Sequence, residues 1–207
     1  MAIGFVSQFL LLQAGDPRLD TLLHAVETHY NRAQSVTLSF TETYTAQRRP
    51  EKVESGALSL RKPGRMRWDY TQPAGKTFIS DGKTVTLYTP DTNQVERTNL
   101  KETEDMRAPL AFLLGKLNFY KEFRKFELRP EGADTWIMAE PNSTNLPYTR
   151  VEFLVAPDAR IRRLRVMAQD HSILDFQFER EKLNPPLDSK LFEFRAPLHA
   201  QIIEGEQ

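Results

Sequence analysis

Hydrophobic and charged residues alternate without a break in the segment RMRWDY, residues 65–70. Side chains of an extended chain point to opposite faces in turn, so Met66, Trp68 and Tyr70 share one face and the charged side chains share the other. The pattern predicts a strand with one face in water and one face that other parts of the chain must cover.

The same alternation recurs along most of the chain and predicts a meander of ten or eleven antiparallel strands. Within it, Asp81-Gly82 is a strong signal for a hairpin turn. The stretch NPPLDSKLFEFRAP, residues 184–197, is expected to give a turn and a short closing strand. The other predicted strands lie in SVTLSFTETYTA, ESGALSLRK, RMRWDY, KTFISDGKTVTLYTP, EFRKFELRP, ADTWIMAEP, YTRVEFLVAP, ARIRRLRVMAQD and HSILDFQFERE. Pro90 and Asp91 turn the chain into NQVERTNL.

Two segments have helical patterns instead. Apolar residues recur at three- and four-residue steps from Asp16 to Ala33, with Pro17 at the first helical position. Residues 109–119, PLAFLLGKLNF, are apolar on nearly every side and predict a short helix. Two helices cannot cover ten amphipathic strands. A strongly curved sheet whose open side is covered by the helices satisfies the pattern and leaves an apolar cavity. An ordinary core filled with side chains satisfies the pattern as well.

Composition narrows the class of protein. The chain has 207 residues, of which 40% are hydrophobic, which is compatible with one large β-rich domain. Lys plus Arg equals Asp plus Glu at 28 each, so no basic excess points to nucleic acid. The chain has no cysteine, which excludes disulfides, thiolate nucleophiles and a Cys-ligated zinc.

The first 15 residues contain an apolar stretch that ends in Gln13, Ala14 and Gly15. This is the pattern of a secretory signal remnant, but the first positive charge is Arg18, so the basic region of a signal is missing. A helix start or a truncated chain fits equally well. No other stretch approaches the roughly 18 apolar residues of a membrane span, so no stable membrane insertion is expected.

Catalytic patterns do not emerge from the sequence. Of its four histidines, His24 and His29 are five residues apart on the predicted helix, about 140° around its axis, and share no metal-binding face. Asp69 is expected on the solvent-facing side of its strand and Asp81 in a hairpin turn, so the two do not make a catalytic pair. No phosphate-binding loop, GxSxG or HExxH motif is present. Neither an enzymatic activity nor a cofactor is therefore expected.

Two motifs carry a family resemblance. The order GALSLRKPGRMRWDYTQP from Gly56 to Pro73, followed by ISDGKTVTLYTPDTNQV from Ile79 to Val95, resembles the LolA family of periplasmic lipoprotein carriers. The N-terminal helix followed by VTLSFTE, and the C-terminal LDSKLFEFRAP, are also similar to that family. The resemblance covers nearly the whole chain after Pro17.

The resemblance implies a mainly β (α+β) fold, an unclosed antiparallel β-barrel of about 11 strands with an α-helical lid, in a single domain over residues 16–207. It implies a monomeric periplasmic carrier that takes acylated lipoproteins from an inner-membrane ABC transporter and hands them to the outer-membrane acceptor LolB. LolB is itself anchored through an N-terminal cysteine, and this chain has none. Alternatives are a periplasmic lipid or glycolipid carrier, a lipid-sensing module, a solid-core β-domain and an enzyme.

The resemblance also implies roles for particular residues. Family members use an arginine before the strand-starting proline to hold the lid helices over the empty cavity. Here Lys62 precedes Pro63, with Arg61 beside it, and lysine lacks the planar fork of a guanidinium. Leu110, Phe112, Leu113 and Leu117 are the predicted lid residues. The predicted cavity wall consists of Phe40, Leu58, Leu60, Met66, Trp68, Tyr70, Phe153, Phe176 and Phe178.

Overall fold

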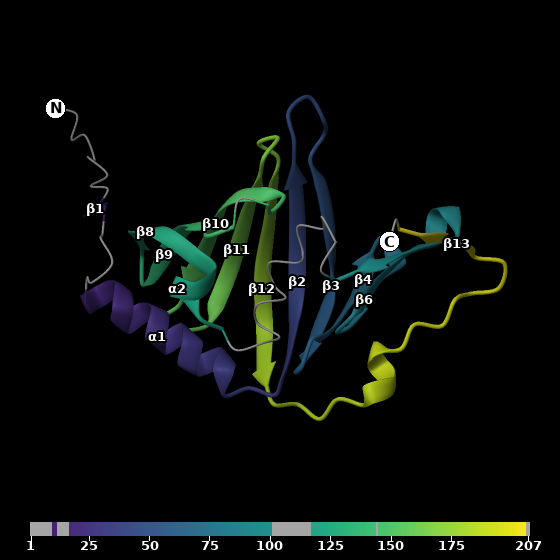
Figure 1. Cartoon of the computed structure of the whole chain (residues 1–207), viewed down its shortest axis with the longest axis horizontal. Coiled ribbons are helices and arrows are strands. Elements are labelled where there is room, and N and C mark those ends of the chain that lie inside the picture. Colours follow the sequence, from purple (N-terminus) through teal and green to yellow (C-terminus); the bar gives the residue numbers. More distant parts are fainter. Residues whose placement is uncertain (1–9, 12–16, 101–116, 144, 206–207) are drawn as a thin grey trace.

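The computed structural model describes residues 10–11, 17–100, 117–143 and 145–205. In these residues a single sheet of thirteen strands has the order β1-β8-β9-β10-β11-β12-β2-β3-β4-β5-β6-β7-β13. The two edge strands, β1 and β13, are not paired with each other, so the sheet stays open (Figure 1). The mainly β fold with an unclosed antiparallel sheet is confirmed, with eleven long strands and a very short strand at each edge.

The sheet is an antiparallel meander except at one edge. β2 pairs with β12 and so joins the two halves of the chain, and β13 pairs with β7 in parallel. The strands are β1 (Leu10–Leu11), β2 (Ser35–Thr45), β3 (Lys52–Arg61), β4 (Arg65–Gln72), β5 (Ala74–Asp81), β6 (Thr84–Thr89), β7 (Gln94–Asn99), β8 (Phe123–Glu131), β9 (Asp134–Pro141), β10 (Tyr148–Val155), β11 (Ile161–Ala168), β12 (Ile173–Leu183) and β13 (Gln201–Glu204).

In the described part of the chain, two α-helices and two short 3₁₀ helices accompany the sheet. They are α1 (Pro17–Asn31), α2 (Phe119–Glu122), η1 (Pro90–Thr92) and η3 (Ser189–Phe192). α1 begins at Pro17, as its sequence predicts. Both α-helices lie against the same half of the sheet, β8 to β12, and the C-terminal segment passes below the sheet to the opposite edge (Figure 1).

Cross-strand register lines up the apolar positions on the concave face. The side chains of Leu38, Leu58, Trp68 and Phe78 form one row over four neighbouring strands. Phe153, Leu164 and Phe176 form another in the other half of the sheet. Together with α1 these rows belong to one continuous cluster of buried hydrophobic side chains, which is the core of the molecule.

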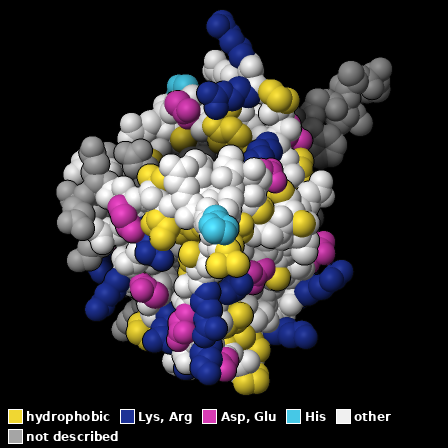
Figure 2. All heavy atoms as spheres, turned by 90° about the vertical axis from the view of Figure 1, so that its right-hand side faces the viewer, with side chains coloured by type: hydrophobic (Ala, Val, Ile, Leu, Met, Phe, Trp, Pro, Cys, Tyr) yellow, Lys and Arg dark blue, Asp and Glu magenta, His cyan; other side chains and the backbone are white. Residues whose placement is uncertain are grey.

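Charged side chains cover the convex face of the half of the sheet formed by β9 to β12. Asp175 accepts two hydrogen bonds from Arg163, at 2.7 and 2.8 Å, and one from Arg165 at 3.0 Å. Arg165 also donates to Glu152 at 3.0 Å and lies over the ring of Trp136, with 5.1 Å between guanidinium carbon and ring centroid. The edge of the molecule near β13 likewise mixes both charge signs with small hydrophobic patches (Figure 2).

One predicted element is wrong. The closing strand expected within residues 184–197 is absent, and this part of the chain holds η3, whose first turn begins where the Asp188 carboxylate accepts the N–H of Lys190. Arg67 donates to the carbonyl of Leu191 at 2.9 Å and Phe192 is buried, so the segment is tied across the sheet instead of extending it. The true last strand, β13, comes later. The short helix predicted at 109–119 lies mostly outside the described residues.

Gly56 has the tightest surroundings of the described glycines. It lies between Phe40 on β2 and Tyr70 on β4, whose rings meet edge to face at 5.1 Å. A Cβ at this position would come 2.1 Å from the carbonyl oxygen of Asp69. Only glycine therefore allows the close approach of β3 and β4 at the irregular register beside Ser55.

Gly56→Ala should lower the free energy of unfolding by about 2 kcal/mol or more, because backbone atoms must move to admit the methyl group. Gly132→Ala is the control, since a Cβ there meets nothing within 4 Å and only its positive φ is strained, a cost of about 1 kcal/mol. Urea denaturation of both variants measures the difference. Equal losses would show that steric contact does not constrain this position.

Candidate functional site

The predicted wall residues all lie on the concave side of the sheet. Each is 9% exposed or less, and they come from strands on both sides of the β12–β2 junction. The residues are Phe40 on β2, Leu58 and Leu60 on β3, Met66, Trp68 and Tyr70 on β4, Phe153 on β10, and Phe176 and Phe178 on β12.

Aromatic rings make the centre of this wall continuous. The ring of Phe40 contacts those of Trp68 and Tyr70 edge to face, at centroid distances of 4.7 and 5.1 Å. Trp68 reaches Phe176 at 5.3 Å, and Phe176 stacks on Phe178 at 5.9 Å. Five rings from β2, β4 and β12 thus join into one apolar surface, which we call the aromatic wall.

Helix α1 covers part of the concave face and is fixed at its C-terminal end. It buries Leu19, Leu23, Val26 and Tyr30. The Tyr30 carbonyl accepts a hydrogen bond from Nζ of Lys62 at 2.8 Å. The ammonium therefore lies at the negative end of the helix dipole, where a cation is favourable. Burial lowers the pKa of Lys62 below its ordinary value.

The Tyr30 side chain joins α1 to two strands. Its hydroxyl donates to Oε2 of Glu181 on β12 at 2.7 Å and accepts the N–H of Ile161 on β11 at 2.9 Å. His29 lies 2.8 Å from the other oxygen of Glu181. Burial, followed by the negative charge of Glu181, raises the pKa of Tyr30 well above its ordinary value, so the phenol is a donor at neutral pH.

A β-bulge explains why Glu181 faces the helix. The register between β12 and β2 shifts between Glu179 and Lys182, and Arg180 has a positive φ of 55°. The extra residue reverses the alternation that placed Phe176 and Phe178 on the concave side. Glu181 consequently occupies the face on which Arg180 would otherwise lie.

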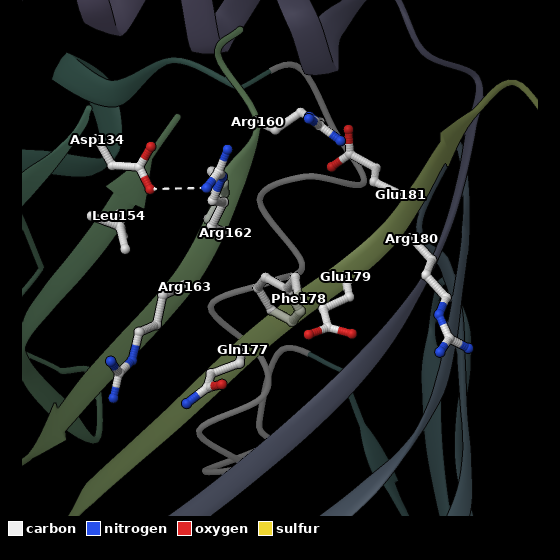
Figure 3. A pocket seen from close by; sticks show the side chains of 11 residues that line it. Asp134, Leu154, Arg160, Arg162, Arg163, Gln177, Phe178, Glu179, Arg180 and Glu181 are labelled. Carbon is white, nitrogen blue, oxygen red and sulfur yellow. Dashed lines mark ion pairs between the residues drawn. The ribbon is translucent and has the colours of Figure 1, made fainter. Parts of the chain in front are cut away.

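The same region contains an opening in the sheet. β11 and β12 are paired only as far as Arg163 and Gln177, and beyond this point they diverge around a hollow of about 480 Å³. Polar and charged side chains surround Phe178 there, and Arg162 forms an ion pair with Asp134 at 3.4 Å (Figure 3). The hydroxyl of Tyr30 contacts both diverging strands, through Glu181 and Ile161.

Of the predicted lid residues, the structure describes Leu117. It is buried, and its backbone is bound to α1 twice: its N–H donates to the Asn31 side chain at 2.7 Å and its carbonyl accepts from the same amide at 2.9 Å. The N–H of Phe119 donates to Glu27 at 2.8 Å. Residues 117–119 are thus attached to α1. Leu110, Phe112 and Leu113 lie outside the described residues.

The two predicted latch residues have different partners. Lys62 contacts α1, whereas Arg61 points to the other face of the sheet and donates to the carbonyl of Leu187 at 2.9 Å. Only Lys62 of the two touches the helix that covers the concave face.

Several anchoring residues escaped the sequence analysis. Tyr30 lies in the predicted helix at a position of the apolar stripe, but the contacts of its hydroxyl are not predictable from that spacing. Glu181 lies on an amphipathic strand, where a glutamate is expected to be exposed to solvent. The bulge that turns its side chain toward the helix has no signature in the sequence. Asn31 and Glu27 bind backbone groups about 90 residues away in the chain.

A polar cluster occupies the far end of the wall. Tyr70 donates to the buried Glu42 at 3.0 Å, and Glu54, on the neighbouring strand, is 3% exposed. Burial alone would raise the pKa of Glu54, but hydrogen bonds from Lys52 and Lys76 outweigh it, so the pKa lies below its ordinary value. Glu54 therefore stays ionised inside the fold because two ammonium groups surround it.

The described residues offer no arrangement for metal chemistry. Among them no three His, Asp or Glu side chains gather closely enough to hold an ion. The carboxylate of Asp69 is occupied by Arg67, and that of Asp81 accepts the N–H groups of Lys83 and Thr84 in the hairpin turn. None of the described helices is long and apolar enough to cross a membrane.

The described residues thus form an open antiparallel sheet whose concave face is a continuous apolar surface, covered in part by α1. The sequence profile of the family "Outer membrane lipoprotein carrier protein LolA" matches residues 31–195. The chain belongs to this family of lipoprotein carriers.

Individual relatives agree with this assignment. The chain is 27% identical over 176 residues to an outer-membrane lipoprotein carrier protein of Bordetella avium, covering 84% of this chain and 82% of the relative. The carrier of Legionella pneumophila strain Corby is 25% identical over 195 residues, covering 94% and 96%.

Solved structures share the fold. A LolA superfamily protein from Nitrosomonas europaea has a TM-score of 0.50 at 10% identity, covering 84% of this chain and 97% of its own. An uncharacterized conserved protein from Thermus thermophilus has a TM-score of 0.53 at 13% identity, covering 91% and 99%.

Lys76→Met should lower the free energy of unfolding at neutral pH by about 3 kcal/mol, because it leaves the buried Glu54 carboxylate without its buried partner. The stability that the depressed pKa of Glu54 provides is complete above its ordinary pKa of 4.5 and is lost as pH falls through the lower folded value. The deficit of the variant should therefore shrink on acidification.

Lys52→Met is the matched control, because the Lys52 side chain is 64% exposed and should contribute about 1 kcal/mol or less. Denaturant unfolding of the three proteins between pH 3 and 7 measures both effects. A deficit of Lys76→Met that is constant over this range would contradict the assignment.

Proposed function

We propose that this protein carries the acyl chains of lipoproteins on its concave apolar wall through the aqueous periplasm, from an inner-membrane ABC transporter to a LolB-like acceptor at the outer membrane. The continuous aromatic wall is the observation that carries this proposal, and membership of the lipoprotein carrier family supports it. The residues proposed to contact the acyl chains are the five of the aromatic wall, Phe40, Trp68, Tyr70, Phe176 and Phe178, together with Leu58, Leu60, Met66 and Phe153.

Energetics favour a carrier in which a lid competes with its cargo. Each buried methylene contributes about 0.8 kcal/mol, so one fully buried acyl chain contributes on the order of 10 kcal/mol. A carrier that kept all of this affinity would not release its cargo. A helix that packs on the same face in the empty state lowers the net affinity by the free energy of its own contacts.

We infer that α1, together with the attached residues 117–119, is the moving cover and that Lys62 is its latch. The bond from Lys62 Nζ to the Tyr30 carbonyl ends at the last turn of α1, so its loss weakens the attachment of the helix without removing apolar surface. In this role a single ammonium replaces the guanidinium used by family members. Arg61 instead donates a hydrogen bond to the C-terminal segment, at the carbonyl of Leu187.

Native mass spectrometry with a triacylated lipoprotein tests the cargo. The purified protein should form a soluble one-to-one complex with the acylated form and none with the same lipoprotein lacking its acyl chains. Binding of free phospholipid alone would indicate a lipid carrier or lipid sensor. Binding of neither would mean that the aromatic wall is an ordinary core.

Lys62→Met should bind a fluorescent acyl probe more tightly than the wild type, by up to about thirtyfold, because a charge-assisted hydrogen bond that favours the closed lid is lost. Lys62→Arg should retain near wild-type affinity. Arg61→Met is the matched control, since it removes one side-chain bond to a carbonyl at the neighbouring position without touching α1. Equal affinities for Lys62→Met and Arg61→Met would exclude Lys62 as the latch.

A further inference from the structure

The indole N–H of Trp68 is a buried donor without an acceptor. Trp68 is 0% exposed, and among the residues that the structure describes its Nε1 has no hydrogen-bond partner. Buried polar atoms in native proteins are almost always paired, so an exception of this kind calls for an explanation.

Two other buried polar atoms in the described residues lack a hydrogen bond, Nε of Arg129 and Oε1 of Glu54, and both belong to charged side chains. The other buried aromatic donors among the described residues have acceptors. The indole N–H of Trp136, the second tryptophan of the chain, donates to Glu131 at 2.7 Å on the convex side. On the concave side the hydroxyls of Tyr70 and Tyr30 donate to Glu42 and Glu181. The fold thus provides acceptors for neighbouring aromatic donors and none for Trp68.

The surroundings of Trp68 explain why the chain itself supplies no acceptor. Its ring contacts Phe40 and Phe176, and its cross-strand neighbours are Leu58 on β3 and Phe78 on β5. All four side chains are hydrocarbon. A phenylalanine at position 68 would supply similar apolar surface without the unpaired N–H, so the indole adds only a donor to a wall that otherwise has no polar atom at this place.

A ligand made of hydrocarbon alone has no use for such a donor. An acyl chain, however, is attached to its glycerol or amine through an ester or amide, and the carbonyl oxygen at the head of each chain is a hydrogen-bond acceptor. In a surrounding of low polarity a single hydrogen bond is electrostatically stronger than in water. The donor therefore suits the one acceptor that every acylated ligand brings into an apolar wall.

We propose that the Trp68 N–H binds an acyl carbonyl of the cargo, so that the carrier recognises acyl esters and amides rather than hydrocarbon in general. This rests on the proposed function and makes it more specific. Because Trp68 lies midway along β4, the bond also sets how deep the head of the acyl chain sits against the aromatic wall. Specificity then comes from one polar atom, and affinity from the surrounding rings.

Indole N–H resonances test the proposal, because the chain has only two tryptophans. A diacylglyceryl-cysteine peptide with ester-linked chains should move the Trp68 N–H resonance downfield in a ¹H–¹⁵N spectrum and leave that of Trp136 unchanged. The analogue with ether-linked chains, which lacks the carbonyls, should bind without that downfield shift. Trp136→Phe removes the second signal and so assigns both.

Affinities provide the second measurement. The wild type should prefer the ester peptide over the ether peptide by about fivefold, the size of one neutral hydrogen bond, and Trp68→Phe should bind both equally. If Trp68→Phe does not fold, the wild-type spectra still decide. Equal binding of ester and ether peptides with no downfield shift would overturn this inference and leave the carrier function intact, whereas no binding of either peptide would overturn the carrier function itself.

Discussion

The structure of this molecule depends on the burial of one apolar sheet face, because ten of the eleven long strands place hydrophobic side chains in the core on the concave side. Closing the sheet would cover that surface permanently, but β1 and β13 remain unpaired with each other. A helix therefore does part of the covering. A cover that is attached by side-chain hydrogen bonds can be removed at far lower cost than a closed ladder of backbone bonds, so an open sheet is the condition for a reversible site.

The convex face is shielded from water by ion pairs rather than by a helix. Asp175 and Glu152 share the guanidinium of Arg165, and the buried Trp136 lies beneath it, so a layer of ion pairs shields the sheet from water without a second layer of backbone. Individually such pairs contribute little, but a network in fixed geometry contributes more. The ion pairs thus stabilise the sheet from its outer face, and under our proposal the inner face binds the ligand.

Alternation with period two was sufficient to predict ten of the eleven long strands, the hairpin at Asp81 and the shared face of Met66, Trp68 and Tyr70, because these follow from local geometry. What failed depends on contacts distant in the chain. The closing strand was misplaced because Arg67 holds Leu191 in a 3₁₀ turn across the sheet. The role of Glu181 was invisible because a bulge reverses the face of β12 after Phe178. Register shifts and side-chain anchors of this kind are set by tertiary packing, not by local preference.

Two kinds of polar group at the concave face have different roles. Those of Tyr30 and Lys62 lie at the end of α1 and determine how firmly the cover is held, whereas the N–H of Trp68 lies within the wall and is unpaired when no ligand is present. The first kind is satisfied only in the closed state, and under our proposal the second only in the loaded state. The closed and loaded states therefore each have a polar contact that the other lacks. Under our proposal these few bonds therefore shift the balance between holding the cargo and releasing it.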